Sequence, residues 1–88
     1  MTQPKLAEQQ FAIGSAEFST GHILKKNGEL FLTGDDFNDF WQIFNSFEQA
    51  KAFIIEKISR NRTIECWVID FTGKTIFFYN KNGEQQLG

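Results

Sequence analysis

The most reactive side chains in the sequence belong to a single cysteine, Cys66, and a single histidine, His22. A cysteine nucleophile needs a base within hydrogen-bonding reach, and no short motif links these two distant positions. One thiol and one imidazole are also too few ligands for a structural zinc site. Cys66 alternates with Ile64 and Val68, which predicts a position for its thiol in an apolar core. We therefore predict no catalytic residue, metal or cofactor, and we expect His22 at the end of a strand.

Three carboxylates lie close together at Asp35, Asp36 and Asp39, and Asn38 adds a fourth oxygen donor. Oxygen clusters can hold Ca²⁺, but this spacing lacks the alternating ligands, central glycine and distal glutamate of an EF-hand loop. Carboxylate pairs also hydrolyse glycosides, although a chain of 88 residues has little room to enclose a sugar. We expect a solvated loop here, in which an aspartate caps a short helical turn.

Charge is distributed unevenly along the chain. Between residues 27 and 50 there is no Lys or Arg, but there are five acidic residues: Glu29, Asp35, Asp36, Asp39 and Glu48. The same window contains six aromatic residues: Phe31, Phe37, Phe40, Trp41, Phe44 and Phe47. This mixture suits contact with a basic protein surface, because charge steers the encounter and aromatic rings anchor the complex. The alternative is that the rings are core residues and the acids are their solvated neighbours.

The clearest element is a helix from Phe47 to about Ser59. Ser46 is a good N-cap, and Gln49 three residues later completes a capping-box pattern. Four apolar residues then fall on one helical face: Phe47, Ala50, Ile54 and Ile58. Asn61 provides a reasonable end to the helix.

Two hairpins flank this helix. Asn27 and Gly28 between the runs 22–25 and 29–33 form a strong hairpin signal, because both residues tolerate positive φ. Residues 72–74 join the strands 63–71 and 75–79. A first strand over 11–18 is expected to bend or bulge at Gly14.

Residues 35–45 support two interpretations. Their aromatic side chains have helical spacing, but 40–44 also forms a compact aromatic and β-branched run directly before the capped helix. We favour a third strand at 40–44. The order is then βββαββ, an α+β fold in which an antiparallel sheet of four or five strands packs against one helix.

The predicted strands 63–71 and 75–79 are apolar on both faces. Trp67, Ile69 and Phe71 fall opposite Ile64, Cys66 and Val68, and Phe77 and Tyr79 fall opposite Ile76 and Phe78. One helix covers only one face of a sheet, whereas such strands should be covered on both. Either residues 35–45 cover the second face, or an exposed aromatic patch marks an interaction site.

The whole chain is predicted to be a single α+β domain at 11–80, between a loose leader at 1–10 and a C-terminal tail at 81–88. Hydrophobic residues make up 41% and charged residues 23%, as in an ordinary globular protein. A net charge of −2 argues against nucleic-acid binding, which needs a concentrated basic surface. No segment resembles a signal peptide or membrane span, and one free cysteine fits the reducing cytoplasm.

These observations favour a non-enzymatic module that binds a protein partner stoichiometrically through an aromatic and acidic surface. We predict Asp35, Asp36 and Asp39 as steering residues and Phe37 and Trp41 as anchors. Inhibitors that neutralise basic nucleases, as immunity proteins do, are an analogy of size and charge alone.

Two alternatives stay open. The first is a homodimer in which an uncovered sheet face carrying Trp67 and Phe77 pairs with itself. The second is a small enzyme or ligand-binding domain with a cleft near His22 and Cys66.

Overall fold

A computed structural model describes residues 3–87 as one helix packed on an antiparallel sheet. The elements in chain order are β1 (Phe11–Glu17), β2 (Ile23–Leu24), a 3-10 turn η1 (Phe37–Asp39), β3 (Gln42–Phe44), α1 (Phe47–Arg60), β4 (Ile64–Ile69), β5 (Thr75–Asn80) and β6 (Gly83–Glu84). This architecture confirms the predicted α+β fold, with one further short strand at the C-terminal end.

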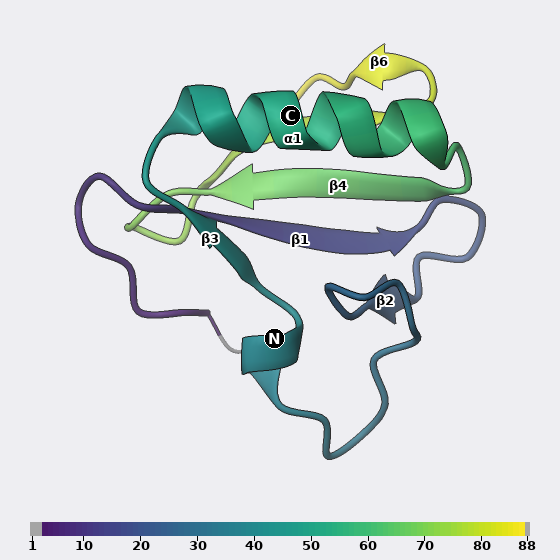
Figure 1. Ribbon diagram of the computed structural model, residues 1–88, viewed down its shortest axis with the longest axis horizontal. Helices are drawn as coiled ribbons and strands as arrows, with labels where there is room; N and C mark the ends of the chain where they lie inside the picture. Colours follow the sequence, from purple (N-terminus) through teal and green to yellow (C-terminus); the bar gives the residue numbers. More distant parts are fainter. Residues whose placement is uncertain (1–2, 88) are drawn as a thin grey trace.

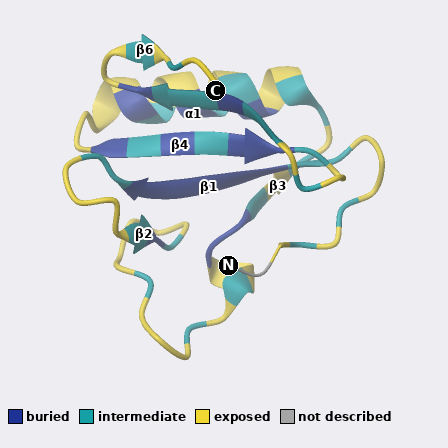
Figure 2. Cartoon of the chain, turned by 180° about the vertical axis from the view of Figure 1, so that it is seen from behind, coloured by how far each residue is buried: buried dark blue, intermediate teal, exposed yellow. Residues whose placement is uncertain are grey.

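The sheet is built around β1 and β4, its most deeply buried strands (Figure 2). The strand order is β2-β1-β4-β5-β6, and β3 also pairs with β1. On the edge of β1 away from β4, β3 pairs with residues 11–13 and β2 pairs with residues 15–16. Two short strands therefore share one edge of β1, and the chain that follows β3 crosses β1 to reach α1 (Figure 1).

Gly14 lies where these two short strands meet, but it does not bend β1. The strand runs unbroken from Phe11 to Glu17, so the predicted bend is wrong. A Cβ atom built on Gly14 would lie only 2.7 Å from Cε2 and Cζ2 of Trp67 on the neighbouring strand. Glycine is needed here because the indole of Trp67 lies directly on the β1 backbone.

The helix forms where the sequence predicts it. The Ser46 hydroxyl accepts a hydrogen bond from the Gln49 backbone N–H at 3.1 Å. This bond satisfies one of the free N–H groups of the first turn. The helix buries Ala50, Ile54 and Ile58 against the sheet, and it runs along β4 (Figure 1).

The first predicted hairpin forms only in part. Its turn is present: Gly28 has φ +91°, and the Asn27 side chain accepts a hydrogen bond from the Glu29 N–H at 2.9 Å. The second arm is reduced to a single bridge between Leu24 and Leu30, so the predicted strand over 29–33 is wrong. The chain leaves the sheet here because the next aromatic side chain, Phe31, packs over the second face instead.

Residues 35–45 combine both interpretations of the sequence. A 3-10 turn occupies 37–39, and the chain then enters β3, a shorter strand than the predicted 40–44. Phe31, Phe37, Phe40 and Trp41 pack over the second sheet face, and we call these four side chains the aromatic cap. The Phe31 and Phe37 ring centroids are 4.7 Å apart, and those of Phe40 and Trp41 are 4.8 Å apart. Of the two sequence alternatives, this segment therefore covers the second face.

The second predicted hairpin forms between β4 and β5. The sheet then extends beyond it, because residues 81–82 turn the chain back and β6 pairs with Tyr79 and Asn80. The Gln85 N–H also donates to the Phe78 carbonyl at 2.8 Å. Residues 81–85, expected in a tail, thus cover part of the outer edge of β5.

No helix within residues 3–87 has both the length and the apolar character needed to cross a bilayer.

Candidate functional site

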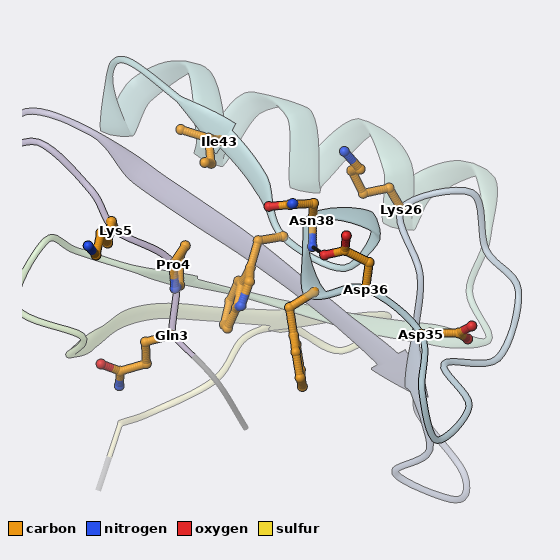
Figure 3. A pocket seen from close by; sticks show the side chains of 10 residues that line it. Gln3, Pro4, Lys5, Lys26, Asp35, Asp36, Asn38 and Ile43 are labelled. Carbon is orange, nitrogen blue, oxygen red and sulfur yellow. Dashed lines mark hydrogen bonds between the residues drawn. The ribbon is translucent and has the colours of Figure 1, made fainter.

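An open groove of about 900 Å³ separates the N-terminal segment from the aromatic cap (Figure 3). One wall consists of Gln3, Pro4 and Lys5. The other side is formed by residues around η1 and β3, with one lysine from the first turn: Lys26, Asp35, Asp36, Phe37, Asn38, Trp41 and Ile43. The groove therefore combines segments that lie far apart in the sequence.

The N-terminal wall has no regular secondary structure, but several contacts hold it in place. Leu6 packs against the second-face core beside the aromatic cap. The Gln3 side-chain amide donates to the Gly73 carbonyl at 3.3 Å, at the turn between β4 and β5. Gln10 closes the segment, because its side chain accepts from the Ala7 N–H at 2.9 Å and donates to the Asn45 side chain at 3.4 Å.

The carboxylates of Asp35 and Asp36 shape the opposite wall. Asp35 Oδ2 accepts from the Leu32 N–H at 2.8 Å and lies 3.8 Å from Lys25 Nζ. Asp36 is the N-cap of η1, and its Oδ1 accepts from the Asn38 N–H at 2.8 Å, as Figure 3 shows. The predicted aspartate cap of a helical turn is thus confirmed, and each carboxylate retains a second oxygen.

Asp39 lies next to the groove without lining it. Its carbonyl accepts a hydrogen bond from the Lys26 N–H at 2.7 Å, which ties η1 to the first turn. Asp39 is exposed and lines a smaller hollow of about 180 Å³ together with Lys25, Lys26 and Asn27. Among the described residues, neither Asp36 nor Asp39 forms an ion pair.

The two predicted anchors line the groove to different extents. Phe37 is half-buried, and its ring packs edge-on against Phe40 with centroids 6.3 Å apart. Trp41 is only 6% exposed, so it presents a small part of its surface to the groove and contributes mainly to the core. The structure therefore gathers Asp35, Asp36, Phe37 and Trp41 in one place.

The two predicted sheet aromatics lie elsewhere. Trp67 is half-buried beneath the cap, and its ring is nearly parallel to that of Phe78, with centroids 6.0 Å apart. Phe77 is 2% exposed and packs on the helix side of the sheet, opposite Val68 in the ladder. Neither residue lines the groove, and Phe77 is not accessible from the surface.

Cys66 and His22 are also absent from the groove lining. Cys66 is buried in the core, as predicted, with Sγ 3.3 Å from the Ser15 hydroxyl, and burial raises the pKa of its thiol. His22 is exposed, and its Nδ1 lies 3.6 Å from Glu17 Oε1. Within residues 3–87, no group of three or more His, Cys, Asp or Glu side chains is arranged to hold a metal ion.

Several groove residues did not stand out in the sequence: Gln3, Pro4, Lys5, Lys26 and Ile43. Ile43 had a usable signal, because side chains alternate along a strand and Ile43 therefore falls on the face opposite Phe44. In the structure Phe44 packs against Phe53 on the helix side. The Ile43 side chain is 48% exposed. Residues 3–5 had no such signal, since their place depends on a long-range contact with the Gly73 turn.

Comparison of the chain with protein-family models, with curated proteins and with solved structures found no match.

Proposed function

We propose that this protein is a non-enzymatic interaction module that binds one protein partner stoichiometrically, with a segment of that partner seated in the groove. The observation that carries this proposal is the groove itself, in which two carboxylates and two aromatic side chains lie along one side. Aromatic side chains supply contact area, and charged groups at the border steer the encounter.

The distribution of charge supports a partner with a basic segment. Asp36 and Asp39 are exposed and form no ion pair with other described residues, so their charge is available to a partner. Lys5 and Lys26 also line the groove. A partner surface complementary to the groove therefore carries both charges, and its basic group faces the aspartates.

The shape of the site also favours a protein segment. Small-molecule sites are clefts or cavities of about 300–1,000 Å³ that bury most of the ligand's surface. The groove reaches about 900 Å³ in volume but is open along its length between the two walls. A side chain or short segment of a larger molecule can enter such a groove without being enclosed.

We infer that the module acts in the cytoplasm. The single cysteine is free and buried, which is compatible with a reducing compartment and leaves no disulfide to form within one chain.

The proposal is tested by capturing partners from a lysate of the source cell with three matched baits. These are the wild type, a groove variant carrying Asp35→Asn, Asp36→Asn and Asp39→Asn, and a control variant carrying Glu48→Gln, Glu56→Gln and Glu84→Gln. Both variants lose three negative charges. Asparagine retains a carbonyl acceptor for the turns at 35 and 36, and the three glutamates are exposed and lie outside the groove.

We expect a partner retained at equimolar ratio by the wild type and the control. Its association rate with the groove variant should be about tenfold lower at low salt, with a weaker dependence on salt. An association rate that is the same for all three baits would show that the three aspartates do not steer binding. Saturation by a small metabolite with no retained protein would instead identify a ligand-binding domain.

A further inference from the structure

The backbone edge of β3 is open beside the groove. β3 pairs with β1 through Phe11–Phe44, Ala12–Ile43 and Ile13–Gln42. No other strand within residues 3–87 pairs with it, and none of the backbone bonds outside the ladder involves residues 42–44. An unpaired strand edge is a template for a further strand.

The other outer strands are better protected. Leu30 bridges Leu24 on the outer side of β2. The β5 edge is covered from Phe78 to Asn80 by β6 and by the Gln85 N–H. β3 differs because a groove runs past it, with Ile43 and Trp41 on the strand side and residues 3–5 opposite.

Resting on the function proposed above, we propose that the partner segment binds in extended form as an added strand on β3, with a basic side chain beside Asp36. In strand addition, main-chain hydrogen bonds supply affinity, and side chains on alternate positions supply specificity. Side chains directed toward the cap meet Phe37 and the exposed part of Trp41. Ile43, which is 48% exposed, becomes covered.

Charge selects among the possible segments. No cation within residues 3–87 forms an ion pair with the Asp36 carboxylate, so a basic side chain of the partner would supply one. Lys5 and Lys26 oppose further positive charge within the groove. The preferred segment is therefore extended and apolar, with one basic residue, and a polybasic peptide binds less well.

The test begins with a random peptide library selected against the intact protein and counter-selected against the groove variant. A selected peptide is then bound to the wild type, and hydrogen exchange of the backbone amides is measured by NMR. We expect an enriched basic position, and exchange slowed by about tenfold or more at one or two amides of Gln42–Phe44.

Two matched peptides separate strand addition from side-chain binding. Methylation of backbone nitrogens in the peptide removes hydrogen-bond donors without changing its side chains. In an added strand only alternate N–H groups face β3, so methylation of that set should weaken binding about fivefold to tenfold. Methylation of the other set should weaken binding much less. Asp36→Asn should weaken binding of the unmodified peptide, whereas Glu84→Gln should not.

Groove-dependent peptides that leave β3 exchange unchanged, or that tolerate methylation at every position, would overturn strand addition and leave the proposed function standing. A selection that yields no groove-dependent peptide would overturn both. Protection of β3 in the protein alone, accompanied by dimer formation in sedimentation equilibrium, would assign this edge to a second copy and contradict a separate partner.

Discussion

The environment of Cys66 suppresses the reactivity expected of a free thiol. The side chain is completely buried, and burial is the main reason that its pKa lies above the ordinary value of 9.0. Its hydrogen-bonding contact with Ser15 and the charge of Lys57 act in the opposite direction but are outweighed. Since the thiolate is the nucleophile, the folded protein holds this cysteine in its unreactive form.

The raised pKa predicts how stability depends on pH. A thiol whose pKa is higher in the folded state contributes fully below the unfolded pKa near 9.0, and this contribution is lost as pH rises through the folded value. Urea unfolding between pH 7 and 10 should therefore show a loss of stability above pH 9, with a slope of up to about 1.4 kcal/mol per pH unit from this group. Cys66→Ala should show a shallower decline, and equal slopes would contradict the assignment.

The sequence predicts a residue's role correctly where that role depends only on nearby positions in the chain. The Ser46 cap and the Asn27–Gly28 turn depend on neighbours a few positions away, and both form as expected. The role of Gly14 does not follow from its neighbours in sequence, because it depends on Trp67, which lies on another strand. A glycine in a strand reports a close approach, but the sequence does not say which residue approaches.

Among the elements, the turn between β4 and β5 supports a wall of the groove. Asp70 Oδ1 accepts hydrogen bonds from the Thr72 N–H at 2.9 Å, the Thr72 hydroxyl at 2.5 Å and the Lys74 N–H at 3.1 Å. This organises a turn whose Gly73 carbonyl receives the side chain of Gln3. The position of the N-terminal wall thus depends on a carboxylate far from it in sequence.

We expect Asp70→Ala to lower the free energy of unfolding by about 1 kcal/mol at pH 7, because the turn loses its shared acceptor. The hydrogen bond from the Thr72 hydroxyl is the largest cause of a lowered pKa at Asp70. Its contribution is therefore present above the ordinary value of 3.8 and is lost as pH falls through the folded pKa.

Urea titrations at pH 7 and pH 3 test this prediction. The wild type and Asp70→Ala should differ less at the lower pH, while Asp70→Asn, which retains one acceptor oxygen, should lie between them at pH 7. A variant as stable as the wild type at pH 7 would show that the turn does not need this carboxylate.

Not every element follows from the residues of its own segment. The helix and the second hairpin follow from periodicity and turn residues within each segment. The loss of the second arm of the first hairpin does not follow from its own residues, because Phe31 packs against Phe37 and Phe40 on the second face of the sheet. The acidic and aromatic side of the groove was visible in the composition of 27–50, whereas the wall at residues 3–5 was not.

For the molecule as a whole, the sheet has a hydrophobic core on each face. The helix-side core centres on Ile54, Ile58 and Val68, and the second-face core centres on Phe40, Trp41 and Ile69. A single helix covers only one face of strands that are apolar on both sides, and the aromatic cap covers the other face as a second layer would. The geometric reason for self-pairing through an uncovered face is correspondingly weaker.

We expect Phe40→Ala to lower the free energy of unfolding by about 3–5 kcal/mol, because the ring is 1% exposed and its loss leaves a cavity. Phe71→Ala, at a position that is 50% exposed, should cost less than about 0.5 kcal/mol. Circular dichroism follows the helix, and the fluorescence of Trp41 and Trp67 follows the second face.

Coincident transitions in the two signals would show that both cores unfold as one cooperative unit. If tryptophan fluorescence changes at a lower urea concentration than circular dichroism, the cap unfolds separately and the two cores do not form one cooperative unit.

The close approach of Trp67 to Gly14 has an evolutionary consequence. A Cβ at position 14 collides with the indole, so a larger residue there is compatible only with a smaller or displaced ring at position 67. The two positions, which face each other across β1 and β4, are thus not free to drift independently. We therefore expect the two positions to covary, with a smaller side chain at position 67 arising before any residue larger than glycine at position 14.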